Sequence, residues 1–511
     1  LSAMKKFLII AVGVLMLVVI GLEPVLRSFR YDIETARLDA APETGRFSRS
    51  VSCWFGDGWL ERSECAWLYP STQGEAMTAL PLVILRRGLF TRADTATVYL
   101  SGGPGGSSYL YEEAMPWWRD WMQQRMGLDH DLVLYDQRGS GYATPRLACP
   151  EFDTRSRQLI LEGASIDAQW EETVPLLEAC AAAVPESERR EGLYSTATAA
   201  QDLRELVRAL REEFGYREVH LYGVSYGTRL AQVALTEPIE GVGRVVLDGF
   251  YPAGLELMGR FADDYAQVLA AAQTQCEGQG GCTGGSLRSL LAQALERLSA
   301  QPVELALPAF EEAAATAGAQ PERLGLTPEN LFALVEAQLT FGLPVAELHG
   351  LLQQAARGEF DARWEELAAD WVYTLDDPEF STLALMLIEC RDNPPLRRET
   401  VAAAIEAHPD WAALLYTPEI AYAQCGRLGV RPQPLRASVI RQPTLLLAAE
   451  FDPRTPTVPA LEQSQAFTQL QTLVLPRSGH SMTDLDDCAA AAAGAFLNRG
   501  AAPPERCAVA P

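Results

Sequence analysis

The sequence predicts an α/β fold in which a mostly parallel central sheet is flanked by helices and carries an inserted helical cap domain. Short apolar stretches suited to strands alternate with amphipathic helical stretches over residues 45–252, and the alternation resumes over 433–511. Residues 253–432, between them, are rich in Ala, Leu, Glu and Gln and lack the alternation. A separate helical domain would share this composition, but the return of strand-and-loop units favours a cap inserted over one sheet.

The first 30 residues predict a signal peptide or a membrane anchor. Lys5 and Lys6 precede an unbroken apolar run over 7–22, which is the order of an export signal. The run is slightly short for a membrane-spanning helix, and no clear small-residue cleavage site follows it. A buried core helix is the alternative, but the terminal position and the two lysines favour export. A cleaved signal and an uncleaved anchor both stay open.

Size and charge exclude some classes of partner. The chain has 511 residues, which is long for one compact core, and its 48% hydrophobic and 21% charged residues are an ordinary globular composition. The formal net charge of −25 would repel a phosphate backbone or an anionic lipid surface. We therefore expect no nucleic acid partner, and membrane attachment only through the N-terminal segment.

The cysteines indicate an oxidising compartment. There are ten, and they fall in neighbouring pairs without the Cys-x-x-Cys spacing of a zinc site. We expect five local disulfides and no metal, in a protein exported to the periplasm or the extracellular space. The expected pairs are Cys53 with Cys65, Cys149 with Cys180, Cys276 with Cys282, Cys390 with Cys425, and Cys488 with Cys507.

Strand-and-loop units are expected in a fixed order along the chain. "TATVYLSGGPGGSS" and "DLVLYDQRGSG" come first, and "AAQDLRELVRALREEFG" follows as an amphipathic helix. The later units are "REVHLYG", "GRVVLDGFYP", "PTLLLAAEFD" and "QTLVLPRSGH". Within the cap, "LTPENLF" has the pattern of a helix start, with Thr327 as the cap and Pro328 in the first turn. Ligands of such sheets sit at the carboxyl ends of the strands, where the loops named here begin.

A Gly-x-Ser-x-Gly motif at residues 223–227 gives the candidate nucleophile. A tight turn alone could use the same small residues, so the motif by itself is a weak signal. Here a strand precedes it and a helix follows, which is the context in which a strained turn exposes a serine hydroxyl. We expect Ser225 to be the nucleophile.

The base and the acid are expected after the last two strands. A serine hydroxyl needs a base, and His480 follows the final strand, whereas the other four histidines precede a strand, lie within one or fall in the cap. Asp452 follows the penultimate strand and can orient the imidazole. Asp248 also ends a strand and is the alternative acid, although a turn or capping role suits it better.

The loop "SGGPGGSS" is the candidate oxyanion hole. Its glycines let the backbone approach a ligand closely, and one backbone N–H is expected from Gly103. The second is expected from Tyr226, the residue after the nucleophile. A plain turn around Pro104 is the alternative, and phosphate binding is excluded because no Lys-Ser/Thr ending follows.

Five motifs, taken in order, resemble the prolyl iminopeptidase and tripeptidyl aminopeptidase family. They are "SGGPGGSS", "YDQRGSGYATP", "GVSYGTRLA", "EFDPRTP" and "SGH", and the resemblance covers most of residues 50–508. It implies the α/β-hydrolase fold, a C-terminal segment like that of the tripeptidyl enzymes, and a serine exopeptidase that acts at free peptide N-termini without a cofactor. Ser101 stands where the prolyl enzymes usually have His, and the segment around Cys425, "CGRLGV", lacks a Trp common in relatives. These departures leave proline specificity open.

An aminopeptidase must also recognise an ammonium group. The resemblance implies acidic cap residues for this, and "LIECRDNPP" offers Glu389 and Asp392. Solvated carboxylates at a helix end are the alternative. An esterase or lipase acting on small esters would share the triad and differ in the cap. A non-catalytic binding protein on the same scaffold would normally have lost a triad residue, and here Ser, His and Asp are all present.

Overall fold

The computed structural model describes residues 44–49, 53–56, 62–88, 93–255, 258–280, 282–308, 322–394, 396–415, 425–436 and 439–507. The predicted export segment over 1–30 lies outside the described residues. Among those that are described, we find no helix with the length and apolarity needed to cross a membrane.

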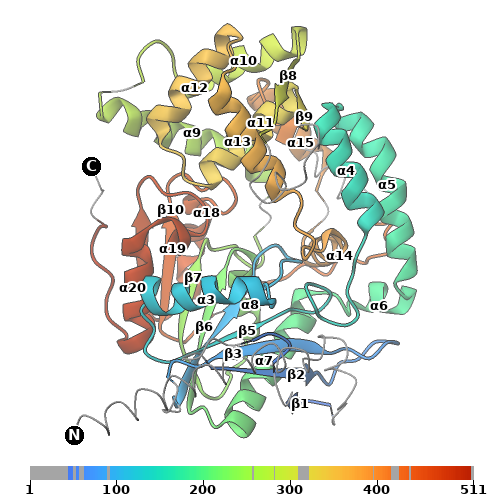
Figure 1. Cartoon of the computed structure of the whole chain (residues 1–511), viewed down its shortest axis with the longest axis vertical. Coiled ribbons are helices and arrows are strands. Elements are labelled where there is room, and N and C mark those ends of the chain that lie inside the picture. The colour runs from blue at the N-terminus through green and yellow to red at the C-terminus, as the bar shows by residue number, and fades with distance from the viewer. Residues whose placement is uncertain are drawn as a thin grey trace, which may run out of the picture.

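One nine-stranded sheet forms the centre of the molecule (Figure 1). Its strands pair in the order β1-β2-β3-β5-β4-β6-β7-β10-β11. The first three pairings are antiparallel, and every pairing from β5 to β11 is parallel. The bounds are β1 Arg46–Arg49, β2 Ser63–Tyr69, β3 Leu80–Leu85, β4 Thr95–Leu100, β5 Asp131–Tyr135, β6 Glu218–Val224, β7 Val242–Asp248, β10 Thr444–Ala449 and β11 Leu470–Leu475. The predicted mostly parallel sheet is confirmed.

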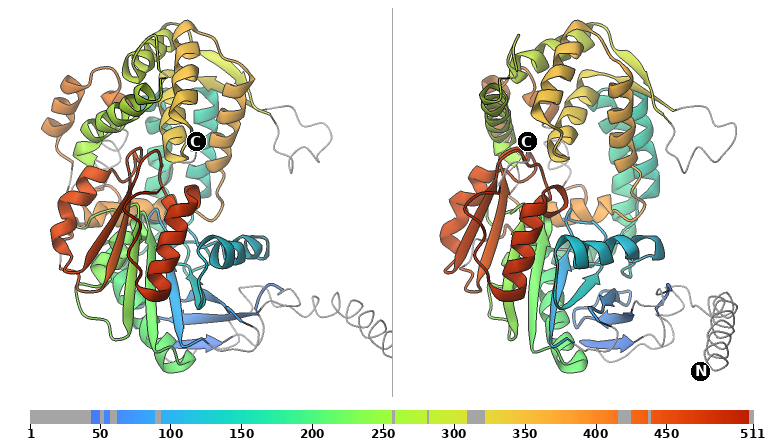
Figure 2. Two further views of the ribbon diagram at one scale, coloured as in Figure 1. Left: turned by 90° about the vertical axis from the view of Figure 1, so that its left-hand side faces the viewer. Right: turned by 60° about the vertical axis from the view of Figure 1, so that its left-hand side comes forward.

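Helices cover both faces of the sheet, because successive strand residues point to opposite faces. In β6, Leu221 joins the apolar cluster under α7 and α8, whereas Tyr222 joins the cluster under α3 and α20. Figure 2 shows the sheet edge-on between these two layers. The helices that flank the sheet are α3 Met115–Asp120, α6 Glu186–Glu191, α7 Thr196–Phe214, α8 Tyr226–Ala234, α18 Thr457–Glu462, α19 Met482–Leu485 and α20 Asp487–Arg499.

The cap lies over the carboxyl ends of the parallel strands (Figures 1 and 2). Its own apolar cluster is built from residues between Tyr265 and Trp411, together with Phe451 from the loop after β10. The predicted helix start at Thr327 is present, because the Thr327 hydroxyl accepts the N–H of Asn330 at the beginning of α11. The cap helices are α9 Phe261–Gly278, α10 Leu287–Ala300, α11 Pro328–Thr340, α12 Val345–Arg357, α13 Ala362–Thr374, α15 Arg398–Ala407 and α16 Ala412–Leu415, with the strand pair β8 Val303–Ala306 and β9 Arg323–Leu326.

Three further helices connect the cap with the sheet. The first is α14 Thr382–Asp392, which lies inside the 253–432 segment but packs into the same apolar cluster as α7 and α8. The others, α4 Pro150–Glu162 and α5 Ile166–Ala183, precede that segment, yet α4 packs on β9 and Asn330 donates to the carbonyl of Ile160 at 2.7 Å. The helical layer above the sheet therefore draws on chain from before residue 253 as well.

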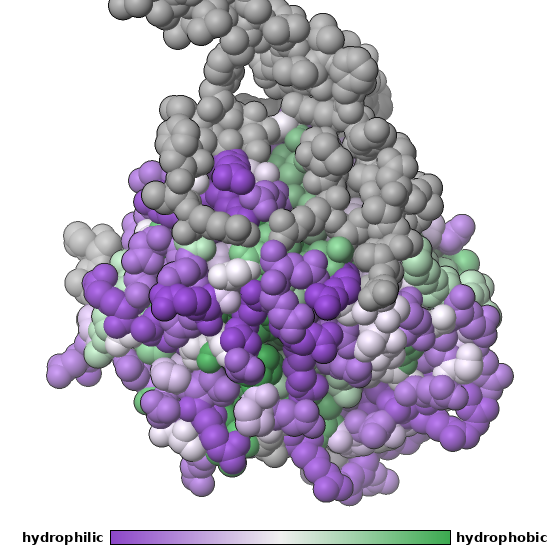
Figure 3. All heavy atoms as spheres, turned by 90° about the horizontal axis from the view of Figure 1, so that it is seen from below, coloured by the Kyte–Doolittle hydropathy of each residue, from purple (hydrophilic) through white to green (hydrophobic). Residues whose placement is uncertain are grey.

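Among the described residues, the end of the molecule away from the cap is mostly hydrophilic (Figure 3). Figure 3 views this face, where hydrophilic side chains surround small apolar areas among the described residues. The structure thus places its helical insertion at one end of the sheet and a solvated surface at the other.

All ten cysteines form disulfides in the five neighbouring pairs expected from the sequence. Two of these bonds tie helices to the chain that follows them: Cys390–Cys425 joins α14 to the chain after it, and Cys488–Cys507 joins α20 to the C-terminal tail.

Candidate active site

Ser225 occupies a strained turn between β6 and α8. Its φ of 54° and ψ of −122° lie in a region that non-glycine residues rarely adopt. The flanking glycines are required by contact, since a Cβ on Gly223 would lie 2.6 Å from the carbonyl oxygen of Gly227, and one on Gly227 would overlap the carbonyl oxygen of Leu100. The N–H of Ser225 donates to the carbonyl of Asp248 at 2.9 Å. This is the geometry of a nucleophile elbow.

Asp452 and His480 meet beyond the ends of β10 and β11. His480 Nδ1 lies 2.8 Å from Asp452 Oδ2, and the carboxylate is fully buried. Asp452 Oδ1 accepts the N–H groups of Arg454 and Thr455, and Oδ2 accepts the Thr455 hydroxyl at 2.6 Å. The N–H of His480 donates to the carbonyl of Thr340 at the end of cap helix α11, at 2.8 Å.

Asp452 and His480 shift each other's pKa in opposite directions. Burial by itself would raise the pKa of Asp452, but the charge and hydrogen bond of His480 outweigh burial and hold that pKa below its usual value. Burial opposes protonation of His480, yet the Asp452 carboxylate raises the pKa of the imidazole above its usual value. Because Nδ1 is held by the carboxylate, Nε2 is the ring nitrogen left for proton transfer.

His480 and Ser225 are brought to the same edge by the end of β7. A Cβ on Gly249 would lie 3.0 Å from Cε1 of His480, so the imidazole ring packs directly on this glycine. The preceding residue, Asp248, holds the N–H of Ser225. The strand order therefore brings the loops that carry Ser225, Asp452 and His480 to the same edge of the sheet.

Asp248 is engaged elsewhere. Its carboxylate accepts the N–H groups of Met482 and Thr483, the Thr483 hydroxyl, and the Tyr222 hydroxyl at 2.7 Å. It thus anchors the first turn of α19, directly after the His480 loop.

The glycine-rich loop after β4 lies against Ser225. A Cβ on Gly102 would come within 3.1 Å of Ser225 Cβ and 3.6 Å of Ser225 Oγ. Gly103 follows with a φ of 109°, and Tyr226 is the first residue of α8, where N–H groups have no acceptor within the helix. Both expected oxyanion donors therefore belong to segments that border the serine.

Comparisons with known proteins agree with this architecture. The profile described as alpha/beta hydrolase fold matches residues 97–273, and the profile described as TAP-like protein matches residues 416–507. The chain is an α/β-hydrolase with a TAP-like C-terminal segment. The resemblance noted in the sequence is confirmed at this level. No curated protein matches the chain.

Solved structures similar to this hydrolase include several kinds of enzyme. An α/β hydrolase fold protein from Chitinophaga pinensis is 12% identical, with 85% of this chain and 97% of that chain covered and a TM-score of 0.36. A proline iminopeptidase from Mycobacterium smegmatis is 14% identical (86% and 98% covered, TM-score 0.33), and an esterase from Exiguobacterium antarcticum is 12% identical (80% and 91% covered, TM-score 0.31). TM-scores as low as these say nothing about the activity of this protein.

Glu389 and Asp392 of the hydrolase lie on α14, where they contact residues of α8 and α7. Both are buried, with 6% and 3% exposed. Glu389 accepts the hydroxyl of Tyr251 at 2.9 Å, and its other oxygen lies 3.7 Å from the guanidinium of Arg229. Asp392 accepts the N–H of Thr196 at 3.2 Å as well as the hydroxyl of that residue, and burial raises the pKa of Asp392 to about 7.

Sequence reasoning missed a second acidic segment, between α13 and α14. Glu379 accepts the hydroxyl of Ser107 at 2.6 Å, and the neighbouring Phe380 lies 3.4 Å from the position of a Cβ on Gly103. Asp377 accepts the hydroxyl of Tyr109 at 2.8 Å. No motif surrounds these carboxylates, because their proximity to the glycine-rich loop arises only from tertiary folding.

The remaining histidines have structural surroundings. His220 is buried within β6, where burial lowers its pKa to about 3 and Nδ1 accepts the N–H of Arg244. In the cap, His349 bonds to the carbonyl of Gly285 and His408 to Asp263. Within the described part of the chain, Asp486, Cys488 and Cys507 form the one group with metal-ligand spacing, and its two sulfur atoms are bonded to each other.

Proposed function

We propose that the protein is an exported serine aminopeptidase that hydrolyses peptide bonds near free N-termini, releasing prolyl or tripeptidyl units through an acyl-enzyme on Ser225. The observation that carries the proposal is a buried Asp452–His480 pair whose imidazole packs on Gly249, next to Asp248, the residue whose carbonyl accepts the N–H of the strained Ser225 turn. This chemistry requires no metal and no cofactor.

Each proton transfer is assigned to His480. As Ser225 Oγ attacks the scissile carbonyl carbon, its proton passes to Nε2, and Asp452 stabilises the imidazolium through Nδ1. The same proton then goes to the leaving amine when the C–N bond breaks. Water attacks the acyl-enzyme by the reverse sequence of transfers, which regenerates Ser225 and frees the N-terminal fragment as an acid.

The oxyanion of the tetrahedral intermediate is assigned to the backbone N–H groups of Gly103 and Tyr226. Donors that are already aimed at the developing charge need no reorganisation during the reaction, and each is worth about 10²- to 10³-fold in kcat. The close approach of Gly102 to Ser225 supports this assignment, since it puts the glycine-rich loop beside the attacking oxygen.

Three carboxylates are candidates for binding the substrate ammonium. Glu389 and Asp392 are the candidates from the sequence, and Glu379 is the candidate from the fold. The contacts favour Glu379, because it lies next to Phe380, which packs on the glycine-rich loop beside Ser225. Burial raises the pKa of the Glu379 carboxyl, and a bound ammonium would offset this by favouring the ionised form.

The decisive experiment compares free and N-acetylated peptide amides with short-chain esters. We expect a strong preference for the free amine, and Glu379→Gln should lower kcat/KM on the free amine by about 10- to 150-fold, the range for one charge-assisted hydrogen bond. Glu389→Gln and Asp392→Asn are the matched variants, and the largest loss among the three identifies the amine site. Equal rates on free and acetylated substrates would refute the aminopeptidase and favour an esterase or an endopeptidase.

The triad itself is tested with Ser225→Ala and His480→Ala. Each should abolish turnover while circular dichroism stays that of the wild type, because the two groups act as a unit. Folded variants within tenfold of wild-type activity would refute the assignment.

Export is supported by the disulfides, which persist only in an oxidising compartment. Mass spectrometry of unreduced peptides from the native protein should recover the five neighbouring pairs. Free thiols at most of these positions would contradict the compartment.

A further inference from the structure

The glycine-rich loop cannot hold its own shape by side-chain packing. It contains four glycines between Ser101 and Ser107. A Cβ on Gly103 would lie 2.9 Å from the backbone nitrogens of Gly105 and Gly106, and one on Gly106 would lie 2.8 Å from the carbonyl oxygen of Gly102. Glycine also loses more conformational freedom on ordering than any other residue. Partners outside the loop must therefore fix its geometry.

A buried chain of hydrogen bonds does this from one side. Gln137 Nε2 donates to the carbonyl oxygen of Ser101 at 3.0 Å and to its hydroxyl at 2.9 Å. The Ser101 hydroxyl in turn donates to the carbonyl of Gly106 at 2.9 Å, and the N–H of Gly106 donates to the carbonyl of Gly102 at 3.2 Å. Ser101 and Gln137 are 2% and 7% exposed, so water does not compete for these bonds.

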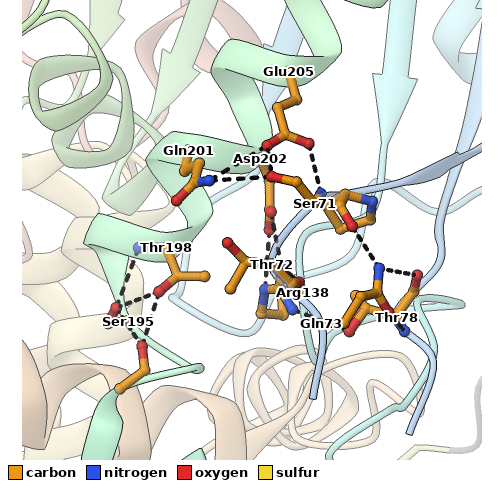
Figure 4. A network of polar contacts seen from close by, with 12 residues as sticks. Ser71, Thr72, Gln73, Thr78, Arg138, Ser195, Thr198, Gln201, Asp202 and Glu205 are labelled. Carbon is orange, nitrogen blue, oxygen red and sulfur yellow. Dashed lines mark hydrogen bonds and ion pairs between the residues drawn. The ribbon is translucent and has the colours of Figure 1, made fainter. Parts of the chain in front are cut away.

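The side chains on either side of Gln137 are fixed as well. Asp136 accepts the N–H of Ser108 at 2.7 Å and therefore holds the far end of the same loop. Arg138 makes a two-point ion pair with Asp202 on α7 and donates to the hydroxyl of Thr78 (Figure 4). Gln137 thus stands on a segment that is tied to the sheet and to a helix.

We propose that Ser101 and Gln137 are positioning residues that hold the 101–106 turn in the geometry that presents its backbone N–H to the oxyanion. The proposal rests on the proposed function, because it requires Ser225 to be the attacking group and this loop to supply a donor. Neither side chain touches the reacting atoms. Their effect is to pre-organise the loop before the transition state forms.

The variants Ser101→Ala and Gln137→Met each remove one link from this series of hydrogen bonds. Ser101→Ala is the milder change because it removes a single oxygen atom. The readouts are kcat, KM and the rate at which a fluorophosphonate labels Ser225, because the phosphoryl oxygen of this probe occupies the oxyanion position in any serine hydrolase. We expect kcat and the labelling rate to fall together by about 10- to 100-fold, with KM and the melting temperature little changed. The double variant should lose no more than the worse single variant, because both act through one chain.

Gln232→Met is the matched control. Gln232 is 1% exposed and accepts the N–H of Ala253 at 2.6 Å, so this change removes a buried glutamine contact away from the loop. Its labelling rate should stay that of the wild type. Wild-type rates in both single variants, or losses that multiply in the double variant, would overturn the positioning role. A wild-type protein that the probe does not label at Ser225 would instead refute the proposed function on which this role depends.

Discussion

Two aspartates stand at the ends of neighbouring strands of the sheet and have almost the same surroundings, yet only one of them contacts an imidazole. Asp248 is the last residue of β7, Asp452 follows β10, and both side chains are fully buried. Each accepts two backbone N–H groups and one threonine hydroxyl. The fourth partner differs, since Asp248 accepts a phenol from Tyr222 whereas Asp452 meets the imidazole of His480.

In the proposed mechanism, that single difference separates a structural carboxylate from a catalytic one. A phenol donates one hydrogen bond and stays neutral. An imidazole can take up a proton, and the carboxylate then stabilises the resulting imidazolium. Burial and the number of hydrogen bonds therefore do not distinguish the two carboxylates. Only the titratable partner of Asp452 distinguishes them. Substitutions at both sites test whether this partner makes Asp452 the catalytic acid.

The largest expected effect comes from neutralising each carboxylate. Asp452→Asn should lower kcat on the order of 10⁴-fold, by analogy with a triad aspartate whose loss leaves the wrong imidazole tautomer. Asp248→Asn should instead lower the free energy of unfolding by about 1–3 kcal/mol, because the amide N–H₂ would replace one carboxylate oxygen and face the N–H donor of either Met482 or Thr483. Steady-state kinetics and denaturant unfolding measure the two effects. The opposite pattern would make Asp248 the acid.

A smaller effect is expected on the pH dependence of activity. The base must be neutral to accept a proton, so activity is lost as pH falls through the pKa of His480. Because Asp452 raises that pKa, the acid limb of kcat/KM in the wild type should lie above about 6.5, the ordinary value for histidine. In Asp452→Asn the limb of the residual activity should move to lower pH. Asp248→Asn should move it much less, since the Asp248 charge contributes less to the shift. Equal shifts in the two variants would erase the proposed distinction.

The smallest effects should come from the matched threonines. Thr455 donates to Asp452 and Thr483 donates to Asp248, at 2.6 and 3.0 Å. Thr455→Val should lower kcat by about tenfold, because the carboxylate loses one of the bonds that orient it. Thr483→Val should leave kcat unchanged and lower the free energy of unfolding by about 1–2 kcal/mol. A similar loss of kcat in both variants would mean that the two aspartates are functionally coupled.

Much of the site could be predicted from the sequence because its signals are local. The glycines at 223 and 227 are required by contacts that any strand-turn-helix of this type makes. A glycine-rich loop after a strand can likewise be recognised from the sequence alone. The order of Ser225, Asp452 and His480 along the chain follows from one sheet topology. The cysteine pairs were predictable for a related reason, since each joins neighbours in sequence.

Other features depended on contacts between distant segments. Glu379 and Ser107 are far apart in the chain, as are Asp392 and Thr196, and no periodicity brings either pair together. For Glu389 and Asp392 the sequence offered exposed helix-end carboxylates or an amine site, and the fold surrounds them with Arg229, Tyr251 and Thr196. The bond between Gln137 and Ser101 likewise joins two loops that meet only because β4 and β5 are neighbours.

By itself, the sequence determined where the strands end and which side chains stand at those ends, because period-2 apolar patterns, glycine sterics and cysteine spacing act over a few residues. Only the tertiary structure decided which of those side chains meet. The sequence favoured Asp452 over Asp248 as the acid but left both strand-end aspartates open, and the position of β11 next to β10 is what brings an imidazole to Asp452. A carboxylate takes its role from the partner that the strand order brings within hydrogen-bonding distance, and strand order is a property of the whole sheet.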